Sequence, residues 1–363
     1  VALSPCGTIV ACVLRRDMKF LPLTLSDVSS SVLSVLVMIV LAHYGYGAMT
    51  LVYGALVTTI SKTLLLQAFR PKIVPFLPSV THLGEVFHYS KYSSTSNIVG
   101  QIGNYSSELI VGKLYSMETV GILSKANSLV AMFNKFFYDA LSQVVAPFIA
   151  EVKRTRDNEV AEKINLITNV QLNFAWPFLL VLALLSDPII FIMLGEQWDD
   201  VQGILIILCI SRMGFSVFQH VNPILMGLGQ AKAIMKIELT SNIVRILVLF
   251  TTSGFGIYVM LISVAAINNI LRASMFLPLI ERELNVRKAQ YIAWLLKPAL
   301  STLLATLPIV IVSIYSKMSW QENIPMYALA IIATALLWLV LLKRQPASVI
   351  LNSIQYRLIK LKG

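Results

Sequence analysis

The stretch SKYSSTSNIVGQIGNYSSELIVGKLYSMETVG, residues 90–121, has the length of a membrane-spanning helix but carries a polar face. Its polar side chains alternate at spacings of four and three residues, which places them on one helical stripe: Ser90, Ser94, Asn97, Gln101, Asn104 and Glu108. In water this pattern is typical of a surface helix. In a membrane the stripe must face a bundle interior or a water-filled cavity, because lipid satisfies neither amides nor carboxylates.

The composition places the chain in a membrane. Of its 363 residues, 57% are hydrophobic and 13% are charged, whereas soluble domains carry about 25% charged residues. The mean hydropathy is +0.76. Long apolar segments recur along the whole chain, which predicts an all-α polytopic membrane protein. The net charge of +11 lies in short clusters between those segments, so we expect no nucleic-acid partner.

The apolar segments predict one partial span followed by ten complete spans. The partial span covers residues 1–14, where the chain starts as if in the middle of a helix, so we expect an N-terminally truncated chain. The complete spans are expected at residues 21–42, 48–69, 93–112, 120–145, 172–194, 201–225, 237–252, 257–279, 292–315 and 325–342.

The loop charges support this count of spans. Basic clusters, such as Arg15 with Arg16 and Lys153 with Arg154, occur in every second loop, and the alternate loops hold only Lys113 and Lys317 between them. A miscounted span would break this alternation. By the positive-inside rule the basic loops and the C-terminus are cytoplasmic.

The chain also repeats itself weakly. Residues 27–64 can be aligned with residues 236–274, and Gly45-Tyr46-Gly47 then falls on Gly254-Phe255-Gly256. Six spans separate the copies, so both have the same topology, as in transporters built from two parallel halves. Chance similarity between two apolar hairpins is the competing explanation.

Further polar side chains lie inside the predicted spans, where charges cost several kcal/mol unless they are paired or hydrated. Together with the stripe they predict a central, predominantly cationic cavity walled by helices of the second half. The expected cations are Lys125, Lys135, Arg212, Arg245 and Arg272. The expected polar lining consists of Asn97, Gln101, Asn104, Asn169, Asn173 and Gln219.

Structural interpretations compete with each of these assignments. Lys125 and Arg272 can snorkel toward a membrane surface. Glu238 and Arg245 are two turns apart, so each can instead bond a neighbouring helix. The amides of residues 97–104 can join helices to one another. Arg212, near the middle of its span, is the hardest to explain in this way.

No enzyme motif, nucleotide-binding segment or metal-ligand spacing is present, so we expect neither a catalytic residue nor a cofactor. Asp199-Asp200 lies in a short external turn and is interpreted as a capping turn rather than a catalytic pair.

Residues 107–129, SELIVGKLYSMETVGILSKANSL, resemble the signature that follows the seventh helix of bacterial polysaccharide repeat-unit flippases. These are the Wzx-type proteins of the multidrug/oligosaccharidyl-lipid/polysaccharide (MOP) exporter superfamily. The matching residues are Leu109, Ile110, Val111, Gly112, Lys113, Gly121, Ser124, Lys125 and Ala126. Segments 14–20, 144–158 and 194–198 resemble further loops of that family. The chain departs from the pattern at Ser107, where an Asp is frequent, and at Leu123, where a Tyr is frequent.

The resemblance implies a MOP-type flippase fold of two helical lobes with fourteen helices, of which this chain would hold the fourth to the fourteenth. It implies the end of an incomplete N-terminal lobe at 1–80, a six-helix C-terminal lobe at 81–288, and two extra spans with a cytoplasmic tail at 289–363.

It also implies that the protein flips undecaprenyl-pyrophosphate-linked oligosaccharides across the bacterial inner membrane by alternating access. Lipid-linked oligosaccharide, membrane lipids, a polymerase and a chain-length regulator are the implied partners. Glu108, beside Ser107, is the candidate carboxylate for ion coupling.

Two other functions stay open. A multidrug exporter of the same superfamily should have acidic, aromatic cavity walls. A membrane polysaccharide polymerase or glycosyltransferase usually has a large external loop with catalytic motifs, whereas the predicted external loops here are short.

Overall fold

The computed structural model describes residues 4–17, 19–47, 49–71, 83–155, 159–315 and 320–343, and the described residues form helices and short connections without strands. The predicted C-terminal tail lies outside the described residues. The chain divides into two compact units, Val1–Val86 and Phe87–Gly363. The finer division at residues 80 and 288 stays a prediction.

The longer helices are α1 (Ser4–Arg16), α2 (Phe20–His43), α3 (Met49–Ala68), α4 (Leu83–Leu114), α5 (Met117–Phe133), α6 (Asp139–Thr155), α7 (Val160–Leu184), α8 (Ser186–Leu194), α9 (Val201–Gln219), α10 (Val221–Gly227), α11 (Ala231–Thr252), α12 (Ile257–Leu284), α13 (Lys288–Tyr315) and α14 (Ile324–Lys343). A π-helix, η1 (Asn134–Tyr138), joins α5 to α6, and 3₁₀ turns η3 (Glu196–Trp198) and η4 (Ser253–Phe255) precede α9 and α12.

Within the described residues every predicted span falls on helix, but several bounds differ. The expected span 120–145 is the start of one path through α5, η1 and α6 that ends at Thr155. The expected span 172–194 is wrong at its start, because α7 begins at Val160 and breaks at Leu185. Polar amide side chains in the N-terminal part of α7 lower its hydropathy, so the predicted span began too late. In the structure they bond back along the helix, with Asn169 Nδ2 2.9 Å from the Asn165 carbonyl oxygen.

Among the described helices, seven paths are long and apolar enough to cross a membrane: those of α2, α3, α7, α9 with α10, α12, α13 and α14. The predicted number of ten complete spans is therefore approximate. The helices outside this set include α4 and α11, which carry many of the polar side chains predicted to face a cavity.

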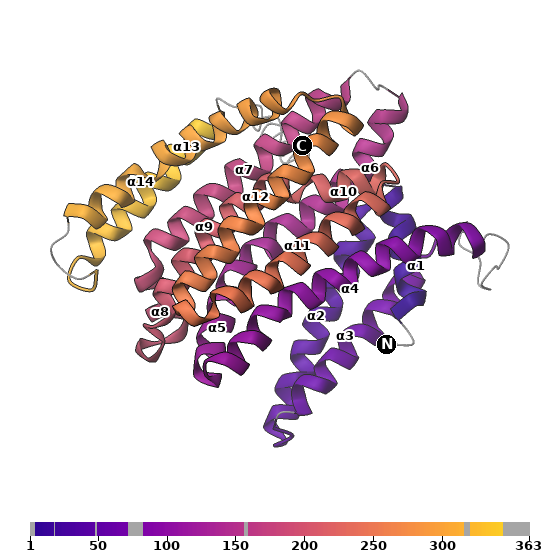
Figure 1. Cartoon of the computed structure of the whole chain (residues 1–363). Helices are drawn as coiled ribbons and strands as arrows, with labels where there is room; N and C mark the ends of the chain where they lie inside the picture. Colours follow the sequence, from indigo (N-terminus) through magenta and orange to yellow (C-terminus); the bar gives the residue numbers. More distant parts are fainter. Residues whose placement is uncertain are drawn as a thin grey trace, which may run out of the picture. The chain divides into compact units, whose positions relative to one another are not determined.

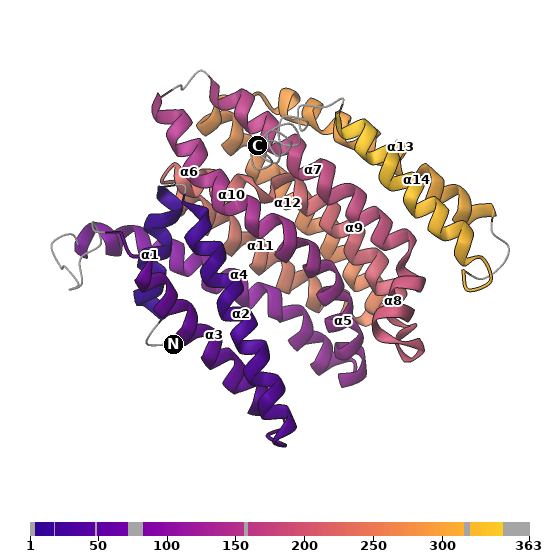
Figure 2. The ribbon, with the colours of Figure 1, turned by 180° about the vertical axis from the view of Figure 1, so that it is seen from behind.

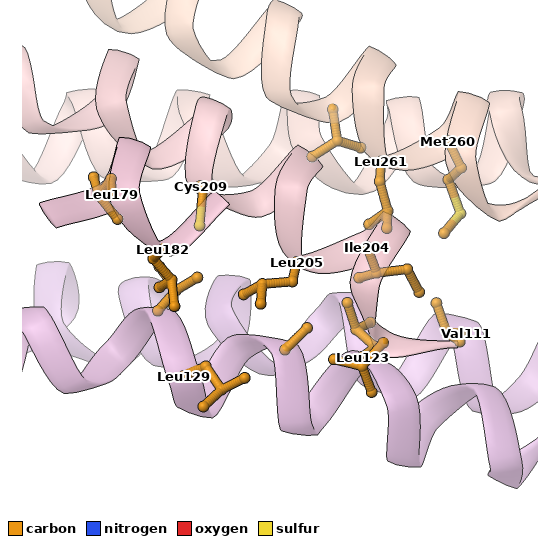
Figure 3. Packing of buried hydrophobic residues seen from close by; sticks show 14 of the residues in the cluster. Val111, Leu123, Leu129, Leu179, Leu182, Ile204, Leu205, Cys209, Met260 and Leu261 are labelled. Carbon is orange, nitrogen blue, oxygen red and sulfur yellow. The ribbon is translucent and has the colours of Figure 1, made fainter. Parts of the chain in front are cut away.

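In the second unit, α9 is the central helix and packs against α5, α7 and α12 (Figures 1 and 2). Two apolar clusters surround its two ends. The first joins residues of α4, α5, α7, α8, α9, α11 and α12, among them Val111, Leu123, Leu179, Leu205 and Leu261 (Figure 3).

The second cluster joins α6, α7, α9, α10, α11, α12 and α13, with Phe276 and Tyr291 fully buried in it. Along α9 the first cluster ends at Cys209 and the second begins at Val217. A layer of the bundle between the two clusters is therefore left for other side chains.

The C-terminal end of α9 is stabilised by side-chain donors from its neighbours. The chain breaks from α9 to α10 at His220, which frees backbone carbonyls that must be satisfied inside the protein. The Tyr138 hydroxyl donates to the carbonyl of Gln219 (2.8 Å), and the Tyr291 hydroxyl donates to that of Val217 (2.6 Å). The π-helix, the helix break and α13 therefore meet at one point.

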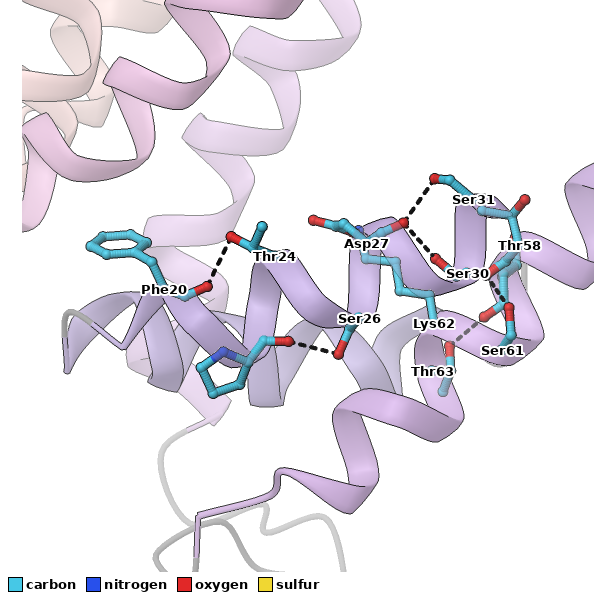
Figure 4. Close-up of polar contacts among 12 residues, drawn as sticks. Phe20, Thr24, Ser26, Asp27, Ser30, Ser31, Thr58, Ser61, Lys62 and Thr63 are labelled. Atoms are coloured by element: carbon cyan, nitrogen blue, oxygen red, sulfur yellow. Dashed lines mark hydrogen bonds and ion pairs between the residues drawn. The ribbon is translucent and has the colours of Figure 1, made fainter. Parts of the chain in front are cut away.

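In the first unit, α2 and α3 form an antiparallel hairpin that α1 packs against. Ser34 Oγ donates to the Gly54 carbonyl (2.8 Å), and Asp27 of α2 forms an ion pair with Lys62 of α3 (Figure 4). In the second unit, α11 and α12 form the corresponding hairpin of the predicted repeat. Gly47 and Gly256, which the repeat aligns, both have positive φ, at 51° and 92°. Common descent of the two hairpins stays a prediction.

A close approach of α9 to α12 generates the first testable prediction. A β-carbon at Gly214 would lie 2.5 Å from Asn269 Nδ2, and that nitrogen donates to the Ser211 carbonyl (3.2 Å). Gly214→Ala should therefore destabilise the protein by about 1–3 kcal/mol through overpacking. Thermal unfolding of the full-length protein in detergent would measure this.

The matched control is Gly121→Ala in α5, where a β-carbon meets no atom within 4 Å and helix propensity should stabilise the protein slightly. Adding Asn269→Ala to Gly214→Ala removes the overlap and should restore most of the lost stability. An unchanged unfolding temperature for Gly214→Ala would contradict the tight contact.

Candidate functional site

A cavity of about 640 Å³ lies inside the second unit, between the two apolar clusters. Its walls are side chains of α4, α5, η1, α6, α9, α10, α11 and α12. On α12, for example, the buried residues of the first cluster end at Val264, the cavity lining runs from Leu261 to Arg272, and the buried residues of the second cluster begin at Phe276. The polar layer of the bundle is therefore bounded by apolar packing at both ends.

One wall of the cavity carries amides. Asn97, Gln101 and Asn104 of the predicted stripe line it from α4. Glu108, one turn further along, also lines it and accepts a hydrogen bond of 3.4 Å from Asn127 Nδ2 of α5. The stripe therefore faces the cavity over three turns of α4, as its spacing predicts.

Guanidinium groups from three other helices line the same cavity: Arg212 of α9, Arg245 of α11 and Arg272 of α12. The central carbons of Arg212 and Arg272 lie 4.9 and 4.5 Å from the centroid of one ring, that of Phe215. The ring faces offer both cations a favourable quadrupole. Phe215 therefore contacts two like charges.

The three arginines differ in their partners. Arg272 Nη2 lies 3.0 Å from Glu238 Oε2 in a buried ion pair between α12 and α11. Arg245 Nη2 donates to Ser107 Oγ of α4 at 3.0 Å. In the described part of the chain, neither Arg212 nor Arg245 has an acidic partner within 4 Å. Two cationic side chains are therefore left without a carboxylate.

The expectation of a predominantly cationic lining is wrong as a count of charges. The lining includes three carboxylates, those of Glu108, Asp139 and Glu238, beside the three arginines. Two of the arginines, Arg212 and Arg272, contact Phe215, where Glu238 pairs with Arg272, while Glu108 lies on the amide wall. Sequence reasoning overlooked this because it weighed the cations of each span and not the phase of the acids.

Lys125 and Lys135 lie away from the cavity. Both side chains are exposed, and the Lys125 ammonium lies 5.3 Å from the centroid of the Trp198 ring. On α5 it is Asn127, Val130 and Ala131 that line the cavity. Lys125, two residues before Asn127, points to the opposite side of the helix, since two residues turn a helix by about 200°.

Asn169 and Asn173 also lie away from the cavity and are buried between helices. Asn173 Oδ1 accepts from Ser301 Oγ of α13 (2.8 Å), and the Asn173 carbonyl accepts from Trp338 Nε1 of α14 (2.7 Å). The Asn173 side chain therefore joins α7 to α13, as polar side chains in membranes often do, whereas the Asn169 amide bonds Asn165 of its own helix. Gln219, by contrast, lines the cavity.

Several lining residues were not among the predicted site residues, including Tyr138, Asn222 and Asn242. Asn127 and Tyr138 are eleven residues apart, which is close to three helical turns, so helical phase could have joined them. No comparable signal marks Phe215, because one aromatic residue in an apolar helix looks like core.

Comparisons with known proteins agree with the predicted family. The family model described as "Polysaccharide biosynthesis protein" matches residues 1–202. The lipopolysaccharide biosynthesis protein WzxC of Escherichia coli K12 is 23% identical over 244 residues, which cover 66% of this chain and 48% of that protein.

The succinoglycan biosynthesis transport protein ExoT of Rhizobium meliloti 1021 is 22% identical over 224 residues, which cover 62% of this chain and 45% of that protein. The chain thus spans about half the length of the curated relatives it matches.

A solved structure of the lipid II flippase MurJ, in an inward closed conformation, is similar in fold. Its TM-score is 0.63 at 14% sequence identity, and the match covers 96% of this chain and 71% of the MurJ chain. The helical fold, the seven apolar helical paths and the family match agree. The chain is a multi-pass membrane protein that belongs to the polysaccharide biosynthesis protein family, as the resemblance to Wzx-type flippases predicted.

Proposed function

We propose that the protein is a transporter, not an enzyme, that flips lipid-linked oligosaccharides across the bacterial inner membrane. Undecaprenyl pyrophosphate is the proposed lipid carrier, and alternating access is the proposed mechanism. The family match and the relatives WzxC and ExoT support this class of function. The observation that carries it is the single cavity lined both by guanidinium groups and by a row of amides.

The arginines are suited to the phosphate groups of such a substrate. Guanidinium binds phosphate oxygens through paired, directional N–H donors. In the described part of the chain, Arg212 and Arg245 have no carboxylate within 4 Å, so they retain charge for an anion. The bundle interior has a lower dielectric constant than water, so these cations attract an anionic ligand more strongly there than they would in bulk water.

The amide wall is suited to sugar hydroxyls. Asn97, Gln101 and Asn104 are all exposed within the cavity, and each amide both donates and accepts hydrogen bonds, as a hydroxyl does. A headgroup with a charged end and a hydroxylated end would match the two walls. The lipid tail needs no room in the cavity, since it can stay in the bilayer.

The orientation and the partners belong to the same proposal. The basic loops and the C-terminus are placed on the cytoplasmic side by the positive-inside rule. A polymerase and a chain-length regulator would use the flipped product. The three cavity carboxylates favour one alternative, export of lipophilic cations. Drug resistance that depends on this protein but not on the lipid-linked sugar would indicate that alternative.

The cavity arginines generate the main test of this function. Arg212→Ala with Arg245→Ala in the full-length protein should abolish surface polysaccharide while expression is unchanged, because the anion would lose both unpaired cations. Staining of surface polysaccharide and immunoblotting of the membrane fraction measure the two quantities. Lys236→Ala is the control, since Lys236 is an exposed cation of α11 outside the cavity lining. Normal polysaccharide in the double variant would refute the proposed role of the cavity.

Glu108 generates a second test, on energy coupling. It is the carboxylate of the amide wall, and its described partner is Asn127 rather than a cation. If an ion binds at Glu108 during transport, the Glu108→Gln variant should still flip substrate in reconstituted vesicles. Its flipping rate should no longer respond to an imposed proton or sodium gradient. A gradient response equal to that of the wild type would remove Glu108 from the coupling mechanism.

A further inference from the structure

The ion pair of Glu238 and Arg272 sits in the wall of the cavity and is almost enclosed by protein. The two side chains are 13% and 8% exposed, and both line the cavity. They join the two helices of the α11–α12 hairpin. The simplest interpretation is that the pair only stabilises the fold as a clamp between α11 and α12, because breaking a buried ion pair typically costs several kcal/mol.

The geometry of the pair is incomplete, however. Both carboxylate oxygens of Glu238 approach the same nitrogen, Nη2 of Arg272, at 3.1 and 3.0 Å. A full pairing of guanidinium with carboxylate uses two parallel N–H donors on two nitrogens. The Nε of Arg272 is buried and has no hydrogen-bond partner. Arg272 therefore has donor capacity that Glu238 does not use.

The surroundings supply a competitor for this arginine. Arg212 and Arg272 line the same cavity and both contact the Phe215 ring, so a diphosphate bound at Arg212 can extend toward Arg272. A phosphate oxygen is a strong acceptor for guanidinium and can replace a carboxylate there. Holding Glu238 on Arg272 limits the uncompensated charge around the ring while no anion is present.

We propose that Glu238 is an internal counter-ion, which holds Arg272 while the cavity is empty and yields it to the diphosphate of the substrate. This inference rests on the proposed function and adds a step to it. Displacing Glu238 weakens substrate binding, and the return of Glu238 to Arg272 assists release. A transport site needs this balance, because a ligand must bind well enough to enter and weakly enough to leave.

The first unit offers a matched control for the clamp interpretation. Asp27 and Lys62 form an ion pair between the two helices of the other hairpin of the predicted repeat (Figure 4). Their side chains are 51% and 39% exposed, and none of the described residues of the first unit is in the cavity lining. Neutralising Asp27 therefore removes an inter-helix ion pair of the other hairpin, a more exposed one, without touching the arginine cluster.

The experiment measures binding of farnesyl diphosphate to the purified full-length protein in detergent, by calorimetry, together with flipping rates in reconstituted vesicles. Glu238→Gln should bind the probe roughly tenfold more tightly, in line with measured couplings of close charge pairs, and should flip substrate more slowly. Glu238→Asp keeps the charge but has a shorter side chain that reaches Arg272 less well, so it should tighten binding of the probe to a smaller degree. This variant provides the test if Glu238→Gln does not fold.

The controls separate competition from a general change of charge. Glu281→Gln, which removes an exposed carboxylate of α12 outside the cavity lining, and Asp27→Asn should change affinity by less than about twofold. The gain in affinity from Glu238→Gln should vanish in an Arg272→Gln background, because the guanidinium for which Glu238 and the diphosphate compete is then absent. A gain that persists in that background, or no gain from either Glu238 variant, would overturn the counter-ion role.

A failure of the proposed function gives a different result. If the wild-type protein binds no farnesyl diphosphate at all, the substrate class is wrong and the counter-ion falls with it. If the wild type binds the probe and the Glu238 variants bind it equally or less well, the transport proposal stands and this inference alone is refuted.

Discussion

Polar side chains in a membrane must find a partner or a hydrated cavity, and this constraint organises the second unit. Hydrocarbon cannot solvate a guanidinium, a carboxylate or an amide. Arg272 therefore pairs with Glu238, and Arg245 reaches Ser107 on α4. The side chains that are left line one cavity between two apolar clusters. The apolar layers hold the helices together, and the polar layer between them is free to bind a ligand.

The same constraint applies to the backbone. A π-helix between α5 and α6 and a break between α9 and α10 both interrupt the regular hydrogen bonding near the cavity. The freed carbonyls of Val217 and Gln219 accept hydroxyls of Tyr291 and Tyr138. Irregular backbone at membrane depth is tolerated where protein or a cavity satisfies it. The interruptions let side chains of η1 and α10 reach the cavity, which straight helices would have placed elsewhere.

The proposed division of labour follows from the placement of charge rather than from its amount. The lining holds as many carboxylates as arginines, yet two arginines lack an acidic partner in the described chain and a third is held by only one of its nitrogens. An anion with several oxygens suits this cluster, and the amides on α4 suit hydroxyl groups. The two walls together fit a phosphorylated carbohydrate better than either wall would alone.

The sequence by itself determined the membrane class, the approximate positions of the helices and the inward face of α4, because hydropathy and helical spacing are local properties. It also placed Arg212, Arg245 and Arg272 in spans where an unpaired charge is costly. The tertiary structure alone decided which polar residues share a cavity. Lys125 and Asn127 are two residues apart, yet Asn127 lines the cavity and Lys125 does not. Asn173 instead accepts a hydrogen bond from Ser301 of α13, and Glu238 of α11 forms an ion pair with Arg272 of α12. Such contacts depend on how each helix is rotated against its neighbours, and side-chain packing between helices sets that rotation.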